Sequence, residues 1–501
     1  MEPARPLRDH LFHLRPEPGV TLQAQLRRKL VDAILEGRMR PGSPLPSCRQ
    51  LSANLGIARN TVALAYQELV NEGFLISAER RGFFVADDVM NGHAATPASP
   101  TPVKTAAPGA GDGWERRLRL KPTRQRNIVK PGNWADYPYP FIYGQIDPAA
   151  FPIATWRECS RQALARDAVR EWSRDHFNED DKLLIEQIRT RLLPRRGVAA
   201  HESEILVTVG AQHALYLMAS LLIDGRTRVG IENPGYADAR NIFALRAREL
   251  IGLETDEEGL VADDRLSPCD YVYVTPSHQF PTTVTMTLDR REALLARAER
   301  DDFVIIEDDY ESEISHVGLP HPALKTLDRN GRVLFVASLS KTLAPGLRLG
   351  YLVGPKALIE EARAMRRLML RHPPANNQRT IAIFLADGHH DALLRRLSQT
   401  FKERWQILHE ALAQHLPDCR VPRSTGGTAV WVEGPAWLDA DRLTVEAAAK
   451  GIVIEPGAVH FLDSDPPRQC FRLGFSSIAT EKIEPGIKLL AEVMRAHRNG
   501  G

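Results

Sequence analysis

Apolar residues recur at helical spacing near the amino end of the 501-residue chain. In the first such segment, from Leu22 to Glu36, one helical face carries Leu22, Leu26, Leu30, Ala33 and Ile34. A second helix is predicted to start at Ser47, with Gln50 completing a capping box, and to end at Gly56. A third runs from Arg59 to Glu72, and two short apolar runs, 74–77 and 82–85, predict a hairpin. This order is typical of a helix-turn-helix with a two-stranded wing.

A different pattern fills the rest of the chain, where short continuous apolar runs end in polar residues. The runs are 205–209, 229–231, 303–306 and 333–337. Such runs predict strands of a parallel sheet that is buried on both faces. Open α/β sheets bind ligands at the carboxyl ends of their strands, so the polar residues that follow these runs are candidate site residues.

The residues at these strand ends suit the chemistry of pyridoxal phosphate. That cofactor needs a lysine amine for its aldehyde, a carboxylate for its pyridine nitrogen and donors for its phosphate. Lys341 is the candidate Schiff-base lysine, Asp308 is expected to face the pyridinium nitrogen and Tyr310 is expected to donate to the phenolic oxygen. The remaining expected cofactor contacts are Ser338, Ser340 and Arg348 for the phosphate, amides at Ala211 and Gln212 opening a helix, and Tyr236 stacking on the ring.

From about Asp136 to its end, the chain resembles the fold-type I aminotransferase superfamily. The resemblance implies the same roles for Asp308, Tyr310, Lys341 and Arg348. It also implies that Arg472, in a Cys-Phe-Arg-Leu-Gly segment, binds the carboxylate of the amino ligand.

One segment departs from the catalytic members of that superfamily. They usually have an asparagine that bonds the phenolic oxygen of the cofactor, and Phe280 stands at that position. His278 is expected to take over as a cofactor contact, with Gln279 as the other candidate, and the alternative for either residue is a hydrogen-bonded loop position. The Pro-Ser-His-Gln sequence at 276–279 matches a regulator branch instead.

Residues Leu45 to Leu75 resemble the winged helix of the GntR family. This resemblance implies that Arg49 and Arg59 bind phosphates or guanine edges and that Asn60 and Thr61 lie at the major groove. By the same resemblance, the wing enters the minor groove with Arg80, Arg81 and Gly82.

Both halves together resemble the MocR subfamily of bacterial regulators. The implied fold is multidomain: a small α/β winged helix-turn-helix domain tethered to a large α/β fold-type I aminotransferase-like domain. The expected boundaries are 14–88 for the DNA-binding domain, 89–130 for a flexible linker, 131–396 for the large cofactor-binding domain and 397–498 for a small subdomain. The resemblance also implies a head-to-tail homodimer and a double-stranded DNA operator with repeated half-sites.

Charge agrees with this division. Residues 1–130 hold 20 Lys and Arg against 12 Asp and Glu, although the whole chain has a net charge of only +2. Part of the basic charge lies at 104–130, for which DNA contact and a solvated linker both remain open. The five cysteines form no close pair or metal-ligand spacing. With no signal peptide and no membrane-length apolar run, this favours a cytoplasmic protein.

The functional prediction is a regulator that senses an amino compound through Schiff-base exchange at Lys341 and controls catabolism of a small amino compound. Two alternatives remain open: a competent aminotransferase, and a regulator of vitamin B6 synthesis that senses pyridoxal phosphate itself. The segment 371–379, with His372 and Arg379, is either an effector entrance or a simple loop. This segment resembles regulators of taurine or ectoine breakdown more than regulators of vitamin B6 synthesis.

Overall fold

The computed structural model describes residues 14, 17, 19–89, 114–317, 321–339 and 341–499. Ser340 and residues 90–113 of the predicted linker therefore lie outside the described residues. The chain divides into two compact units, Met1–Arg117 and Leu118–Gly501.

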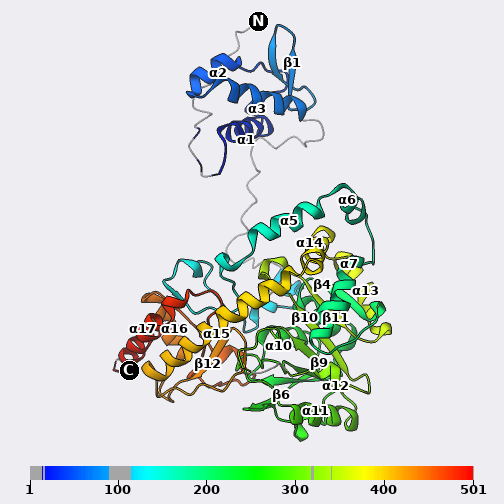
Figure 1. The fold of residues 1–501 in the computed structure, drawn as a ribbon, viewed down its shortest axis with the longest axis vertical. Coiled ribbons are helices and arrows are strands. Elements are labelled where there is room, and N and C mark those ends of the chain that lie inside the picture. The colour runs from blue at the N-terminus through cyan, green and yellow to red at the C-terminus, as the bar shows by residue number, and fades with distance from the viewer. Residues whose placement is uncertain are drawn as a thin grey trace. The chain divides into compact units, whose positions relative to one another are not determined.

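The first unit has the three helices and the hairpin that the sequence predicts (Figure 1). Its elements are α1 (Leu22–Leu35), α2 (Cys48–Leu55), α3 (Arg59–Asn71), β1 (Leu75–Ala78), β2 (Gly82–Val85) and the short α4 (Trp114–Arg117). Ser47 caps α2, because its Oγ accepts from the N–H of Gln50 at 3.2 Å. Gly56 ends that helix with a left-handed backbone, φ +64°.

A compact apolar core holds these elements together. The hydroxyl of Tyr66 donates 3.0 Å to the carbonyl of Pro46, and its ring meets Phe83 edge-on at 4.9 Å. Leu22, predicted on the buried face, is exposed because it opens α1, ahead of the core that begins at Leu26. The strands β1 and β2 pair antiparallel with Leu75 opposite Val85.

An eight-stranded sheet organises the second unit. Its strands, in spatial order, are β4 (Ile205–Thr208), β11 (Gly350–Val353), β10 (Val333–Ser338), β9 (Val304–Asp309), β8 (Tyr271–Val274), β5 (Arg228–Asn233), β6 (Glu249–Asp256) and β7 (Gly259–Leu260). The strands from β10 to β6 are parallel, while β11 runs antiparallel to both of its neighbours and β7 to β6.

Both faces of this sheet are buried, as the continuous apolar runs predict. Leu206 packs in one core cluster, whereas its neighbours Ile205 and Val207 pack in another, so successive side chains enter opposite cores. The helices of this part of the chain are α5 (Ile153–Ala163), α6 (Arg166–Trp172), α7 (Lys182–Gln187), α8 (Leu193–Arg195), α9 (Ala211–Leu222), α10 (Ala237–Ala244), α11 (Leu288–Arg300), α12 (Leu324–Leu327), α13 (Lys356–Leu370) and α14 (Ala375–Ala386).

The carboxyl-terminal part adds a smaller sheet to the same unit. Its strand order is β12 (Ala429–Glu433), β15 (Cys470–Gly474) and β14 (Glu455–Pro456), with α15 (His389–His415), α16 (Ala440–Ala449) and α17 (Thr480–Asn499). Leu397, the expected start of the small subdomain, lies inside the continuous helix α15. The early strand β3 (Tyr139–Pro140) pairs in parallel with β13 (Ile452–Val453) and so ties the start of the unit to its end. Among the described residues, no helix is long and apolar enough to cross a membrane.

Candidate functional site

A cavity of about 240 Å³ lies where β8, β9 and β10 end. Most of the residues that the sequence predicts for the cofactor line it, although they come from segments far apart in the chain. Its walls are Ile128, Lys130, Tyr143, Ala211, Gln212, Tyr236, Asp238, Tyr273, Thr275, Phe280, Asp308, Tyr310, Ser338, Lys341, Pro345 and Arg348. The fold thus brings Asp308, Tyr310 and Lys341, which were predicted from strand ends, to one cavity.

Asp308 presents one free carboxylate oxygen to this cavity. The hydroxyl of Tyr273 donates 2.8 Å to Oδ2 of Asp308, while Oδ1 is buried and has no hydrogen-bond partner in the described part of the chain. Burial raises the pKa of Asp308 to about 7. An unpartnered acceptor of this kind fits the protonated nitrogen of a pyridine ring, which would both satisfy Oδ1 and favour the ionised carboxylate.

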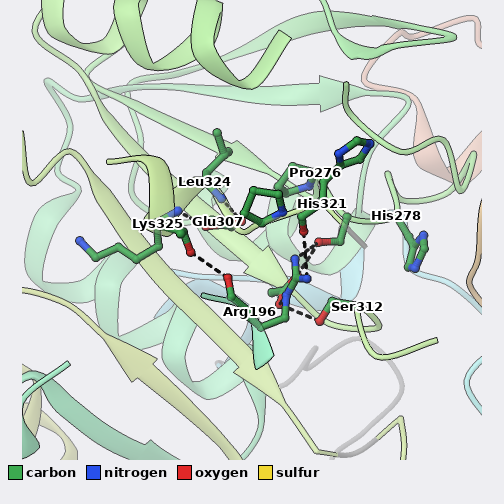
Figure 2. A network of polar contacts seen from close by, with 12 residues as sticks. Arg196, Pro276, His278, Glu307, Ser312, His321, Leu324 and Lys325 are labelled. Atoms are coloured by element: carbon green, nitrogen blue, oxygen red, sulfur yellow. Dashed lines mark hydrogen bonds and ion pairs between the residues drawn. The ribbon is translucent and has the colours of Figure 1, made fainter. Parts of the chain in front are cut away.

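The residues on either side of Asp308 belong to a polar network behind the sheet, drawn around Arg196 in Figure 2. Arg196 Nε lies 2.7 Å from Oδ2 of Asp309. Burial acts to raise the pKa of Asp309, but the charge of Arg196 and the hydroxyls of Ser277 and Ser312 hold it below its usual range. Because side chains alternate along a strand, this network fixes the end of β9 and directs Asp308 to the cavity.

Glu307 fixes β9 from one residue further back. Its two carboxylate oxygens accept from the N–H groups of Leu324 and Lys325, each at 2.8 Å (Figure 2). Those amides open the short helix α12 (Leu324–Leu327), where a carboxylate is favoured by the helix dipole. The strand end that carries Asp308 is therefore held by bonds on both neighbouring residues.

Lys341 has the properties of an amine nucleophile. Burial lowers its pKa to about 8, and the nearby charge of Glu311 acts in the opposite direction. Its Nζ lies 4.1 Å from the centre of the Tyr143 ring. A lysine with a lowered pKa has more neutral amine at neutral pH and attacks a carbonyl carbon more readily.

The start of α9 and Arg348 form a cradle for an anion. Gly210 precedes α9 with φ +78°, and a Cβ built on it would lie 2.9 Å from Nη2 of Arg348. The positive φ favours glycine here, and the close approach shows how near the guanidinium of Arg348 lies to the start of α9. The first amides of the helix, at Ala211 and Gln212, have no partner within the helix, and Ser338 lines the same cavity. These groups suit a phosphate.

Aromatic rings close the cavity on another side. Phe280 meets the ring of Tyr236 edge-on at 5.0 Å and that of Tyr310 at 5.9 Å. The hydroxyl of Tyr236 donates 3.0 Å to Asp238. The hydroxyl of Tyr310 donates a hydrogen bond of 2.7 Å to the carbonyl of His278. To donate to a phenolic oxygen of the cofactor, this hydroxyl would have to break that bond.

Arg472 is a buried cation whose guanidinium makes no hydrogen bond to any described residue. It lies in β15 with 0% of its surface exposed, and Nε, Nη1 and Nη2 are all unpartnered. Its Cζ lies 3.6 Å from the centre of the Tyr143 ring and 4.2 Å from that of Phe280. Burying an unpaired charge costs several kcal/mol, so this guanidinium is strongly disposed to bind an acidic group.

His278, predicted as a cofactor contact, does not line the cavity. Its Nε2 lies 3.1 Å from the carbonyl of Ile314, and burial lowers its pKa to about 4. Gln279, the other candidate to replace the missing asparagine, donates 2.8 Å to the carbonyl of Pro234. Both side chains are engaged by backbone carbonyls, and Phe280 alone of the three faces the cavity.

The segment 371–379 also lies away from the cavity lining. Ala375 opens the helix α14, and Nε of Arg379 pairs with Asp181 at 2.6 Å. His372 Nδ1 lies 2.9 Å from the carbonyl of Pro373. The described contacts of this segment are therefore structural.

Sequence reasoning missed several residues that line the cavity, among them Lys130, Tyr143 and Tyr273. Tyr273 had a readable signal, because it lies in a strand that runs parallel to β9 and ends at the same sheet edge. Lys130 had none, since its segment reads as part of a linker.

The predicted DNA-contacting residues form an exposed surface of the first unit. Arg49, Arg59 and Asn60 are exposed, while Thr61 is half-buried. The hairpin turn exposes Arg80, Arg81 and Gly82, with positive φ at Arg80 and Gly82. Within the described residues none of the four arginines forms an ion pair, unlike Arg27, which pairs with Glu72. These free cations suit contact with DNA phosphates.

Comparisons with known proteins agree with both units. Residues 22–85 match the bacterial regulatory proteins of the gntR family, and residues 179–490 match aminotransferase class I and II. The HTH-type transcriptional regulator TauR of Rhodobacter capsulatus is 41% identical over 97% of this chain and 99% of its own length. The probable rhizopine catabolism regulatory protein MocR of Rhizobium meliloti is 29% identical over 97% and 96%.

A solved structure agrees with the second unit. The kynurenine aminotransferase of Pyrococcus horikoshii, in complex with PMP, superposes with a TM-score of 0.70 at 26% identity, covering 77% of this chain and 98% of that one. Together with the fold, these matches confirm the predicted pairing of a DNA-binding unit with a fold-type I unit. The chain belongs to the MocR-type bacterial transcriptional regulators, in which a GntR-family helix-turn-helix is joined to an aminotransferase class I and II domain.

Proposed function

We propose that this regulator binds pyridoxal 5'-phosphate at Lys341 and senses a small amino compound there. The single observation that carries the proposal is the buried guanidinium of Arg472, which has no hydrogen-bond partner in the described residues and packs against Tyr143 and Phe280, two walls of the cavity that Lys341 lines. A reactive amine in the cavity and an unpaired cation packed against two of its aromatic walls suit a ligand that has an amine at one end and an acid at the other. The regulated genes serve catabolism of that compound.

The described residues fit the cofactor at three points. Asp308 has a free buried oxygen for the pyridine nitrogen. Arg348 and the first amides of α9 suit the phosphate, and Tyr236 lines the wall on which the ring stacks. The cofactor supplies an aldehyde carbon, which forms a Schiff base with an amine.

Effector sensing follows from exchange at that amine. Lys341 is the residue that would hold the cofactor aldehyde as a Schiff base, and its amine would be freed if the amine of the effector bound the aldehyde carbon instead. Arg472 binds the acidic end of the effector through parallel hydrogen bonds. The two states of the protein differ in these contacts, which is the condition for a ligand to shift a conformational equilibrium and so the affinity for DNA.

DNA is bound by the first unit. Arg49 and Arg59 contact phosphates or guanine edges, Asn60 and Thr61 lie at the major groove, and the turn at Arg80–Gly82 enters the minor groove. Support comes from the exposure of the arginines and from their lack of ion pairs with described residues. The operator carries repeated half-sites, because two copies of the chain assemble head-to-tail.

Exposed apolar side chains support that homodimer. Leu368, near the end of α13, is 83% exposed, and Met369 and Leu370 next to it are also exposed. Apolar side chains gathered on a surface are typical of subunit contacts. Light scattering should give twice the chain mass, and Leu368→Asp should lower it if α13 lies in the contact.

The test uses the full chain loaded with pyridoxal phosphate. Amino acids, amino sulfonates and diamino acids are added in turn, with and without a 2-oxo acid, while visible absorbance is followed. A stable spectral change that needs no 2-oxo acid is expected for the effector. Sustained conversion that consumes a 2-oxo acid would make the protein an aminotransferase instead.

Lys341→Ala is the decisive variant. It should lose both the absorbance of the Schiff base and the effect of the effector on DNA binding. Lys356→Ala, which removes an exposed lysine of α13, is the matched control and should change neither. A normal response from Lys341→Ala would exclude the covalent model.

A further inference from the structure

Residues 125–130 form a strap over the second unit, here called the pocket strap. In sequence they follow the boundary between the two units at Arg117. The side chain of Gln125 donates 2.9 Å to the carbonyl of Asn241. The side chains of Arg240 and Asn241 donate hydrogen bonds of 2.7 and 2.9 Å to the carbonyl of Arg126. The end of the segment that the sequence assigns to a flexible linker is thus hydrogen-bonded to the body of the second unit.

The helix that holds the strap also carries a wall of the cavity. Arg240 and Asn241 lie in α10, which begins directly after the cavity-lining Tyr236. Arg240 further donates 2.7 Å from Nη1 to the carbonyl of Val459, in the carboxyl-terminal part of the chain. The helix that holds the strap therefore begins next to Tyr236, a wall residue of the cavity.

The other end of the strap enters the cavity itself. Ile128 and Lys130 line it, and Nζ of Lys130 lies 3.1 Å from Oε1 of the buried Glu455. The same ammonium donates to the carbonyl of Tyr143. Lys130 remains partly exposed, with 28% of its side chain accessible, so its long stem can move without opening the core.

Three cations gather around one aromatic ring at this point. Measured to the centre of the Tyr143 ring, Cζ of Arg472 lies at 3.6 Å, Nζ of Lys341 at 4.1 Å and Nζ of Lys130 at 5.4 Å. A Cβ built on Gly144 would lie 2.8 Å from Nζ of Lys341 and 3.6 Å from Nζ of Lys130, so the two ammonium groups converge on that glycine. The charge of Lys130 adds to burial in lowering the pKa of Lys341.

We propose that Lys130 is a second cationic contact for the acidic end of the effector, beside Arg472, and that the pocket strap thereby reports occupancy of the cavity to the chain leading to the DNA-binding unit. The inference rests on the proposed function. Lys130 exchanges its bonds to Glu455 and to the Tyr143 carbonyl for bonds to the acid. Because the strap is one end of the connection between the units, a change in its contacts alters the segment from which the DNA-binding unit extends.

The alternative is that Lys130 only neutralises the buried Glu455. Two probes separate the two roles in the full chain loaded with pyridoxal phosphate. One is the amino acid or amino sulfonate to which the native chain responds among β-alanine, γ-aminobutyrate and 2-aminoethanesulfonate. The other is propylamine, which has an amine and no acid. The readout is half-saturation of the visible spectral change.

Lys130→Met should raise half-saturation for the acidic amine about tenfold, the effect of one lost charged hydrogen bond, and leave that for propylamine unchanged. Lys130→Arg should restore most of the loss. Lys121→Met, four residues before the pocket strap and outside the cavity lining, is the control and should behave as native. An equal loss for both probes would show that Lys130 only supports the fold, and would overturn the inference.

Hydrogen exchange of the peptide 118–130 tests the reporting step. The acidic amine should slow exchange in this peptide in the native chain but not in Lys130→Met. Unchanged exchange, in a sample whose absorbance shows that the amine has bound, would overturn the inference and leave the proposed function standing. If no amine changes the absorbance, the proposed function fails, and the inference fails with it.

Discussion

The hydroxyl of Tyr273 donates a hydrogen bond of 2.8 Å to Oδ2 of Asp308, while the second oxygen of that carboxylate has no partner among the described residues. Burial raises the pKa of Asp308 to about 7, and the bond from Tyr273 opposes that rise by stabilising the ionised form. The pair thus holds a carboxylate near the midpoint of its titration at neutral pH. A bound pyridinium would complete its ionisation.

Tyr273→Phe should weaken binding of pyridoxal phosphate about tenfold near pH 7, because losing one hydrogen bond to a charged group costs about 1.5 kcal/mol or more. Without the bond, the pKa of Asp308 rises further and less of the carboxylate is ionised. The loss should shrink above pH about 8, where the carboxylate ionises in both proteins. Titration of cofactor absorbance measures the affinity. Tyr271→Phe, in the same strand but outside the cavity lining, should bind normally.

The rate at which Lys341 combines with pyridoxal phosphate should rise with pH through about 8. The neutral amine is the reactive form, and burial lowers the pKa of Lys341 to about 8 from a usual value near 10.5. Glu311 acts to raise that pKa, so Glu311→Gln should move the midpoint to lower pH. Stopped-flow absorbance at a series of pH values gives the midpoint. The exposed Glu299→Gln serves as the control, and an equal midpoint in native and Glu311→Gln proteins would contradict the assignment.

Local sequence signals predicted the site residues that follow or lie in strands. Lys341 and Asp308 are readable because each lies at or just beyond an apolar run, and strand ends converge by topology, while Arg348 lies just before the strand β11 (Gly350–Val353). The two wing strands and the three helices were readable from periodicity in the same way. Local sequence patterns therefore predict each helix or strand and the residues at its end.

Non-local pairing decides the remaining residues. Tyr143 and Lys130 precede every strand predicted for the large domain, and β3 reaches the site region by pairing with β13 more than three hundred residues later in the chain. The spacing of residues along the sequence does not predict a contact between segments so far apart in the chain. His278 shows the opposite problem: it lies next to site residues in sequence, yet its ring turns to the carbonyl of Ile314.

Phe280 should support Arg472 by presenting its ring 4.2 Å from the guanidinium. Phe280→Leu keeps an apolar side chain but removes this cation–π contact, worth about 1 kcal/mol, so half-saturation for an acidic amine should rise roughly fivefold. The melting temperature should also fall, because the ring is buried. Phe401→Leu, which removes another buried ring from α15, should lower the melting temperature without the change in half-saturation. Equal affinities in Phe280→Leu and Phe401→Leu would show that the ring serves packing alone.

Arg59 should contribute one phosphate contact to DNA binding. It opens α3, is exposed and pairs with no acid in the described part of the chain. Arg59→Ala should therefore weaken binding to a mixed-sequence duplex and reduce the slope of log affinity against log salt by about 1. Fluorescence anisotropy at several salt concentrations measures both quantities. Arg38→Ala is the matched control, because Arg38 is exposed but already pairs with Glu36 at 2.6 Å. If the two variants keep the native salt slope alike, Arg59 does not touch a phosphate, and the DNA contact of α3 must rest on Asn60 and Thr61.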